Sequence, residues 1–284
     1  MSITERAPAK VNLFLHVGER RADGFHPLQS LAVFTGAGDE LRAEAAPALS
    51  LTLEGPFAKG LAAESDNLVL RAARALAAKA GILFGAALTL SKHLPVASGI
   101  GGGSADAAAA LRALKKLWRL EIEDAALLDI AAALGSDIPV CLPSASAYME
   151  GRGEILTPVA VPRLPILLVN PSVAVPTREV FATLKDRCGT GMALPRGGFA
   201  DAAALLAFLA ATRNDLEAPA RALQPAIGGV LEMLAALPGA LLARMSGSGA
   251  TCFALFADEA SCARGALALQ AANPGWWVEP SLIR

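Results

Sequence analysis

This chain of 284 residues has no excess of charge of one sign. It holds 25 Lys and Arg residues and 26 Asp and Glu residues, which gives a formal net charge of −1. A chain so balanced has no broad basic surface for nucleic acid and no polybasic patch for a membrane, so we expect neither partner. Hydrophobic residues make up 54% and charged residues 18%. This composition excludes an intrinsically disordered protein, which has few apolar residues and a high net charge.

Cysteine is scarce, and the few residues present are too dispersed for a disulfide framework or a zinc site. No Cys-x-x-Cys spacing and no cluster of Cys with His occurs in the sequence. We therefore expect reduced thiols and a cytoplasmic protein. The cysteines are Cys141, Cys188, Cys252 and Cys262.

Long hydrophobic runs are also missing. The mean hydropathy of +0.46 suggests a membrane protein at first. Much of it comes from alanine, however, and no stretch of about 18 apolar residues runs without charges or breaks at glycine and proline. The first ten residues include Glu5, Arg6 and Lys10 and have no apolar centre, so we expect no signal peptide.

The length predicts two domains, since a domain typically has about 150 residues. Residues 162–165, Pro-Arg-Leu-Pro, are typical of a linker, which places the domains at residues 1–160 and 161–284. Strands lead in the first half and alternate with helices in the second, which favours an α+β fold for both. We expect strands at 8–17, 28–34, 39–45, 49–54, 86–92, 145–150, 154–159, 166–170, 241–245, 251–256 and 277–279, and helices at 67–81 (capped by Ser65, Asp66 or Asn67), 104–118, 124–134, 177–184, 200–211, 227–237 and 260–271.

A glycine-rich segment, residues 95–104, lies between an expected strand and an expected helix. Four glycines in five positions let backbone N–H groups approach a ligand, and the start of the next helix carries a partial positive charge. Together these features indicate a phosphate site, to which the Ser104 hydroxyl adds a contact to phosphate or Mg²⁺. The alternative interpretation is a turn whose glycines only permit tight packing.

Several phosphate-binding folds are excluded by their missing signatures. The chain has no G-x-x-x-x-G-K-[ST], no complete dinucleotide fingerprint and no protein-kinase motifs. A second glycine motif, residues 246–249, is by itself typical of a hairpin turn. Two such loops, expected in different domains, suggest a ligand held between them.

Two charged residues stand out because their surroundings are apolar or rigid. Lys10 lies in an apolar strand, where lysine is rare, and Asn12 points to the same face. A solvated strand face is the slightly favoured interpretation of this pair. Asp137 precedes Ile138-Pro139, which is typical of a helix N-cap. A capping position also fixes a carboxylate rigidly, so capping and catalysis are compatible.

Four motifs occur together in order, and as a set they resemble the GHMP kinase superfamily, named for galactokinase, homoserine kinase, mevalonate kinase and phosphomevalonate kinase. The resemblance implies a two-domain α+β fold. Its N-terminal ATP-binding domain would be like domain 2 of ribosomal protein S5, and its C-terminal domain ferredoxin-like. The motifs are residues 8–13, 95–105, 135–140 and 246–250.

Further motifs resemble one branch of that superfamily, whose substrate is a cytidyl diphosphate of methylerythritol in the non-mevalonate route to isoprenoids. Two departures from the branch stand out. Phe25 replaces a frequent tyrosine, and Ala105-Asp106 replaces a common Ser-Asn, which brings an unexplained negative charge near the phosphate site. The further motifs are Asp23 to Ser30, Gly151 to Leu156, Asn170 to Phe181 and Asn214 to Glu217.

The resemblance implies transfer of the γ-phosphate of ATP, with Mg²⁺, to a tertiary 2-hydroxyl. Asp137 would accept the hydroxyl proton, and Lys10 would keep Asp137 ionised and stabilise charge at the γ-phosphate. No residue is assigned as a metal ligand. The triphosphate would bind Pro95, Val96, Ala97, Ser98, Gly99, Ile100, Gly101, Gly102, Gly103, Ser104 and Ala105.

The same resemblance assigns the acceptor site. Asn12 and Thr177 would bind the erythritol hydroxyls, Phe25 and Phe181 would stack on cytosine, and His26 would bind its polar edge. Without the resemblance, the two phenylalanines are interpreted as core and His26 as a turn residue.

Two other functions stay open: a kinase of the same superfamily with a homoserine-type or mevalonate-type acceptor, and a nucleotide-binding module without catalysis. We expect small-molecule partners only and a monomer or weak homodimer.

Overall fold

The computed structural model describes residues 2–22, 24–61, 67–83, 85–184, 189 and 191–284. Among the residues singled out in the sequence, Asp23, Ser65, Asp66 and Cys188 lie outside these ranges. The chain forms two compact units. The proposed domain boundary at residue 160 stays a prediction, because the units are interleaved along the chain. Unit 1 is Met1–Ala9, Gly38–Val96 and Gly101–Ser144, and unit 2 is Lys10–Ala37, Ala97–Ile100 and Ala145–Arg284.

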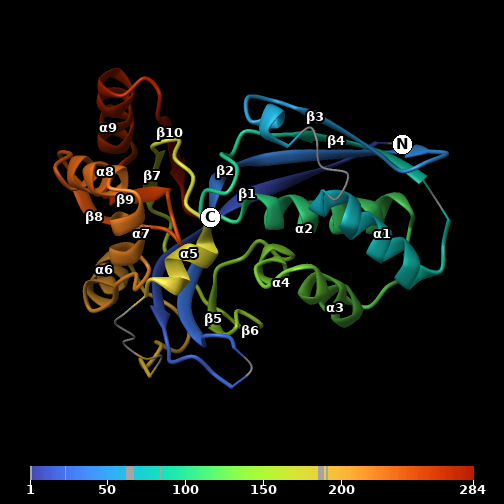
Figure 1. Ribbon diagram of the computed structural model, residues 1–284, viewed down its shortest axis with the longest axis horizontal. Coiled ribbons are helices and arrows are strands. Elements are labelled where there is room, and N and C mark those ends of the chain that lie inside the picture. The colour runs from blue at the N-terminus through green and yellow to red at the C-terminus, as the bar shows by residue number, and fades with distance from the viewer. Residues whose placement is uncertain (1, 23, 62–66, 84, 185–188, 190) are drawn as a thin grey trace. The chain divides into compact units, whose positions relative to one another are not determined.

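Unit 1 is built from strands with helices packed along them (Figure 1). Residues 40–46 of β2 pair with β4 in antiparallel fashion, and β4 pairs with β3 in parallel. Helix α1 begins where the Asn67 side chain accepts from Val69 N, and it ends at Gly81 in the left-handed conformation. The elements are β1 (Ser2–Val17, shared with unit 2), β2 (Leu28–Ala46, also shared), β3 (Ser50–Glu54), a 3₁₀ turn at Ala58–Gly60, α1 (Leu68–Ala80), β4 (Gly85–Ser91), α2 (Gly102–Leu117), α3 (Asp124–Leu134) and α4 (Ile138–Cys141).

Among the boundaries that differ from the sequence-based prediction, two differ because glycines lie inside elements. β2 is one strand of 19 residues rather than two strands, 28–34 and 39–45. Its Gly38 is needed because a Cβ there would lie 2.7 Å from Ala7 O. Helix α2 begins at Gly102 rather than Ser104, after Gly101 adopts a φ of 63°. Glycine in these two places permits close approach and helix capping rather than a turn.

Unit 2 contains a four-stranded antiparallel sheet in the order β10-β7-β9-β8. With helices between β7 and β8 and between β9 and β10, this is the βαββαβ topology of a ferredoxin-like domain, which confirms the predicted fold. The other elements of this unit include the hairpin of β5 and β6, with β5 pairing residues 28–32 of β2. The bounds are β5 (Ala147–Gly151), β6 (Ile155–Pro158), β7 (Pro165–Asn170), α5 (Thr177–Ala182), α6 (Ala202–Ala210), α7 (Glu217–Leu223), α8 (Ala226–Ala235), β8 (Ala240–Met245), β9 (Cys252–Phe256), α9 (Glu259–Ala272) and β10 (Trp277–Leu282).

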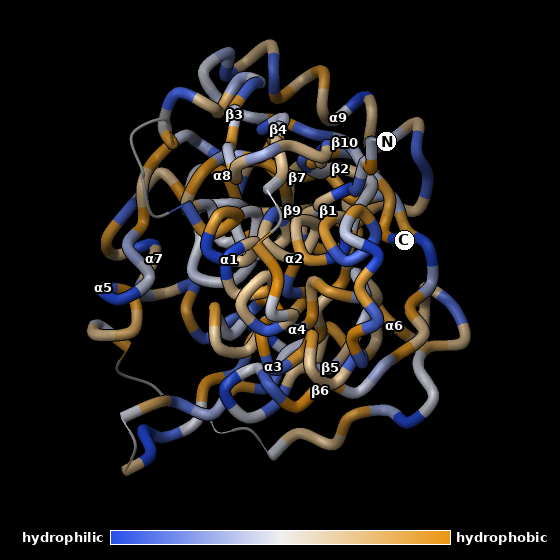
Figure 2. Tube along the Cα trace, turned by 90° about the vertical axis from the view of Figure 1, so that its right-hand side faces the viewer, coloured by the Kyte–Doolittle hydropathy of each residue, from blue (hydrophilic) through white to orange (hydrophobic). Residues whose placement is uncertain are grey.

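The core of unit 2 lies between this sheet and its helices. Every residue of β7 and β9 is buried, as expected of strands covered on both faces. Helix α6 is hydrophobic along its whole length (Figure 2), and Phe208 from it packs against Phe14 and Phe199. In the part of the chain described, no helix combines the length and apolar character that crossing a membrane requires.

Candidate active site

Lys10 and Asn12 on β1 are buried, with 4% and 2% of their surface exposed. The interpretation of this pair as a solvated strand face is therefore wrong. The Lys10 ammonium donates to Asn12 Oδ1 at 3.0 Å, and Asn12 Nδ2 donates to Ser30 Oγ at 2.8 Å. Burying an ammonium group is costly unless it is hydrogen-bonded or paired. The hydrogen bond to Asn12 therefore offsets part of the cost of burying Lys10.

The middle of the glycine segment lies against this strand within unit 2. Lys10 N donates to Ile100 O at 2.9 Å, and Thr251 N donates to Ser98 O at 3.1 Å. Gly99 has a φ of 77°, and a Cβ there would lie 2.6 Å from Ser246 O. Only glycine fits this place, because the backbone conformation and the neighbouring carbonyl both exclude a side chain.

The second glycine motif contacts the first directly. The Ser246 hydroxyl accepts from Asn12 N at 3.1 Å and donates to Gly99 O at 3.0 Å. The expectation that the two loops lie in different domains is wrong here, since residues 97–100 and 246–249 belong to one unit, and a ligand held between the loops stays a prediction. The second loop supports the first. The sequence analysis named Ser246 only as part of a motif and did not predict its contacts with Asn12 and Gly99.

Asn214 fixes the supporting loop, and Thr177 contacts its far end. Asn214 Nδ2 donates to Met245 O and Gly247 O, both at 2.8 Å. The Thr177 and Ser248 hydroxyls are 2.8 Å apart. Within unit 2 the structure thus joins Lys10, Asn12, Ser98, Gly99, Ile100 and Thr177 through one hydrogen-bonded network of two loops and a strand.

We expect Gly99→Ala to lower the melting temperature and to raise KM for ATP. Placing alanine in a left-handed conformation costs about 1–2 kcal/mol, and the contact with Ser246 O adds to that cost. Gly103→Ala is the matched control for stability, because Gly103 lies in a helix with open space at its Cβ position. It should raise stability by up to about 1 kcal/mol. Equal destabilisation by the two variants would contradict the argument.

The rest of the glycine segment belongs to unit 1. Pro95 and Val96 are its first two residues, and Val96 is exposed. Gly102, Gly103, Ser104 and Ala105 form the first turn of α2, a helix of 16 residues. The first N–H groups of a helix have no partner inside it, which suits a phosphate ligand.

Asp137 lies at the N-cap position of α4, as predicted, but its side chain makes no capping hydrogen bond. The predicted N-cap position is therefore confirmed, although the Asp137 side chain does not cap the helix with a hydrogen bond. Pro139 stands near the start of this four-residue helix, where its missing N–H is not needed. Asp137 belongs to unit 1 and Lys10 to unit 2. That the two meet at one alcohol stays a prediction.

Asp106 faces a buried lysine. Lys92 Nζ donates to Asp106 Oδ2 at 2.7 Å and also to Asp39 Oδ2. Asp39 Oδ1 accepts from His93 N at 2.6 Å and Leu94 N at 2.8 Å. The chain just before the glycine segment and the helix just after it are thus tied to β2. This gives the Asp106 carboxyl group a structural role.

The charges in this Asp39–Lys92–Asp106 cluster are unbalanced, because two carboxylates share one ammonium. Burial raises the pKa of Asp106 to about 8, although Lys92 opposes the rise. Asp106 Oδ1 is buried without a hydrogen-bond partner. Burial also lowers the pKa of Lys92, but the two carboxylates outweigh it and hold that pKa above its ordinary value.

Three aromatic side chains assigned to the acceptor lie in unit 2. The rings of His26 and Phe181 have centroids 5.8 Å apart and planes inclined at 30°. Phe25 is 48% exposed, and the Arg152 guanidinium lies 3.8 Å from its ring centroid. His26 thus meets Phe181, whereas Phe25 has a cation on one face. Arg152 was not predicted as a partner, because a cation–π contact leaves no signal in sequence spacing.

The described residues do not fit a resident metal ion. Among them, no three His, Cys, Asp or Glu side chains lie together as ligands. Asp106 Oδ1 has no hydrogen-bond partner and could in principle bind a metal ion. It belongs, however, to a carboxyl group whose other oxygen already accepts from the Lys92 ammonium. Mg²⁺ bound to nucleotides takes most of its ligands from phosphate and water rather than from a protein cage.

Comparisons with known proteins agree with this architecture. Residues 67–144 match the family model for the GHMP kinases N terminal domain, and residues 193–275 match that for the GHMP kinases C terminal domain. The chain is 54% identical over 279 residues to 4-diphosphocytidyl-2-C-methyl-D-erythritol kinase of Cereibacter sphaeroides, covering 97% of both chains. It is 53% identical over 285 residues to the kinase of that name from Parvibaculum lavamentivorans, covering 98% of this chain and 97% of the relative.

Solved structures extend the comparison to three dimensions. A crystal structure of 4-(cytidine 5'-diphospho)-2C-methyl-D-erythritol kinase matches with a TM-score of 0.82 and 34% identity, over 99% of this chain and 100% of that one. A homoserine kinase from Cytophaga hutchinsonii matches with a TM-score of 0.70 at 19% identity, over 100% and 94%, which shows a shared fold. The chain is therefore an enzyme that belongs to the GHMP kinase family and, within it, to the 4-diphosphocytidyl-2-C-methyl-D-erythritol kinases.

Proposed function

We propose that the protein transfers the γ-phosphate of ATP to the 2-hydroxyl of 4-diphosphocytidyl-2-C-methyl-D-erythritol, giving the 2-phosphate and ADP in the non-mevalonate route to isoprenoids. The observation that carries the proposal is the buried Lys10 ammonium, hydrogen-bonded to Asn12, on a strand that binds the glycine segment. The names and high identity of the relatives support the acceptor. Mg²⁺ would arrive with ATP as part of the substrate.

Phosphoryl transfer depends on alignment and charge neutralisation, so each proposed role is a positioning or electrostatic one. Asp137 accepts the proton of the attacking hydroxyl. Lys10 keeps that carboxylate ionised and balances charge on the γ-phosphate. Residues 95–105 bind the triphosphate through backbone N–H groups, aided by the start of α2.

The acceptor is bound by polar and aromatic side chains in this proposal. Asn12 and Thr177 bind the erythritol hydroxyls, and Phe25 and Phe181 stack on cytosine. Stacking tolerates any base, so the choice of base depends on hydrogen bonds. His26 Nδ1 lies 3.0 Å from Gly18 O. Because a carbonyl only accepts, Nδ1 carries the proton, and in the neutral ring Nε2 is left as an acceptor. An acceptor suits the amino group of cytosine and repels the carbonyl of uracil.

We expect ADP release with the cytidyl acceptor and little with homoserine or mevalonate. CDP should compete with the acceptor at least tenfold better than UDP, since one unmatched hydrogen bond costs about 1–3 kcal/mol. Coupled measurement of ADP release tests both points. Turnover with homoserine or mevalonate alone would move the assignment to another acceptor. ATP binding without ADP release on any acceptor would favour a nucleotide-binding module.

We further propose that the enzyme works in the cytoplasm as a monomer or weak homodimer. The buried thiols of Cys252 and Cys262 support a reducing compartment. Gel filtration over a range of concentrations checks the oligomeric state.

A further inference from the structure

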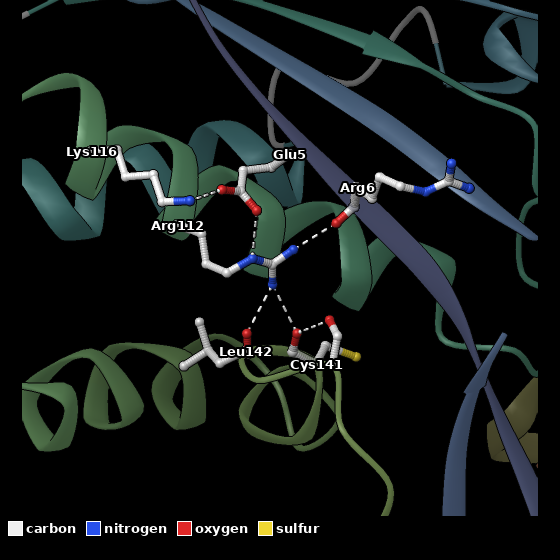
Figure 3. Close-up of polar contacts among 7 residues, drawn as sticks. Glu5, Arg6, Arg112, Lys116, Cys141 and Leu142 are labelled. Carbon is white, nitrogen blue, oxygen red and sulfur yellow. Dashed lines mark hydrogen bonds and ion pairs between the residues drawn. The ribbon is translucent and has the colours of Figure 1, made fainter. Parts of the chain in front are cut away.

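Arg112 on α2 joins two other elements of unit 1 (Figure 3). Its Nη1 donates to Cys141 O at 2.9 Å and Leu142 O at 3.0 Å, at the end of α4. Its Nη2 donates to Arg6 O at 2.6 Å, and its Nε donates to Glu5 Oε2 at 2.9 Å, both on β1. One side chain thus holds a strand and the end of a helix against α2.

The three elements joined by Arg112 each carry part of the proposed catalytic machinery. Helix α2 begins in the glycine segment, α4 follows directly after Asp137, and Arg6 lies four residues before Lys10 on β1. The proposed mechanism gives no role to Arg112, although its guanidinium donates four hydrogen bonds.

Helix α4 depends on such an outside contact. It has only four residues, and the last carbonyls of any helix lack partners within it. Arg112 supplies donors to the carbonyls of Cys141 and Leu142, the first of which also accepts from Ser144 Oγ at 2.9 Å, so α2 helps to hold the end of α4 in place. A four-residue helix has too few internal hydrogen bonds to hold its own position.

Glu5 holds the guanidinium in place and is shared with a second cation. Lys116 Nζ lies 2.5 Å from Glu5 Oε1, and the Lys116 side chain is 62% exposed against 20% for Arg112. Burial alone raises the pKa of Glu5, but hydrogen bonds from Lys116 and Arg112 bring it below its ordinary value. Glu5 therefore stays ionised at neutral pH. Lys116 shares Glu5 with Arg112, while the bonds to α4 come from Arg112.

We infer that Arg112 is a positioning residue for the transfer step: it fixes α4, and through α4 the Asp137 carboxylate, relative to the glycine segment. The inference rests on the proposed role of Asp137. It predicts a defect in kcat rather than in ATP binding, because the start of α2 binds the nucleotide without help from Arg112. A misplacement of about 1 Å at a reacting group costs on the order of 10²-fold in rate.

The test compares Arg112→Ala, Arg112→Lys and the matched control Lys116→Ala, all assayed well below their melting temperatures. We expect Arg112→Ala to lower kcat by about 10–100-fold with KM for ATP within about twofold of wild type. Arg112→Lys should recover only part of the loss, because an ammonium lacks the fork that spans β1 and α4. Lys116→Ala should stay near wild type. Added guanidinium at tens of millimolar should raise kcat of Arg112→Ala and leave Lys116→Ala unchanged.

Two outcomes would overturn the inference. One is a lower melting temperature for Arg112→Ala and Arg112→Lys with unchanged kcat, which would make Arg112 purely structural. The other is an equal loss of kcat in Lys116→Ala, which would assign the effect to the charge of Glu5. Failure of the proposed function is recognised separately, by full turnover of an Asp137 variant with Arg112 intact.

Discussion

Replacing Asp137 with asparagine is expected to lower kcat by about 10²–10⁴-fold, the usual contribution of a general base. A tertiary alcohol is a weak nucleophile, so its proton must leave as the oxygen attacks phosphorus. Asparagine has nearly the shape of aspartate but cannot accept that proton. The assays are run well below the melting temperature of the variant, so that any change in stability does not enter kcat. The measurements are steady-state ADP release, ATP affinity by calorimetry and thermal melting.

Asp129→Asn is the matched control for the Asp137 variant. Asp129 is an exposed acidic residue on α3, so its replacement removes the same charge from unit 1 without touching the proposed site. It should keep wild-type turnover. If Asp137→Asn also turns over at the wild-type rate, Asp137 is not the base, and the proposed mechanism fails while the family assignment stands.

Periodicity and glycine placement predicted most of the fold. Strands β7 and β9 were predictable because their apolar runs match their burial, whereas the ferredoxin-like fold of that half was implied by the resemblance to the GHMP kinases. The sequence analysis divided β2 into two strands, because glycine usually interrupts a strand. Glycine is required at position 38 because Ala7 lies against it. These two residues are 31 positions apart, and the local sequence carries no signal of their contact.

The candidate site was only partly predictable, for a similar reason. Lys10 and Asn12 alternate with apolar residues, a pattern shared by solvated and buried polar faces. Only the tertiary structure shows that β1 is covered on both sides there. Asp106 was puzzling in sequence because nothing local links it to Lys92, its hydrogen-bond partner, or to Asp39, which shares Lys92 with it and lies 67 positions away.

Lys92→Met is expected to destabilise the protein by about 3–5 kcal/mol, the usual cost of removing one partner from a buried ion pair. Methionine fills a similar volume but leaves the carboxylates of Asp39 and Asp106 buried without a cation. Because the cluster ties both ends of the glycine segment to β2, KM for ATP should rise as well. Chemical denaturation with a linear extrapolation measures the free energy of unfolding, and kinetic assays measure KM.

The pH dependence of this stability separates lost ion pairing from lost packing. The folded pKa of Asp106, about 8, lies above the unfolded value of 3.8. The stability contributed by its bound proton is thus complete below pH 3.8 and is lost as the pH rises to about 8. Asp106→Asn should match the wild type below pH 3.8 and exceed it by a margin that grows up to about pH 8, because the amide is never charged. In Lys92→Met the fall with pH should steepen, since no ammonium then opposes the second carboxylate. If Lys92→Met loses the same free energy at every pH, packing rather than charge governs the cluster, and the glycine segment is held by shape alone.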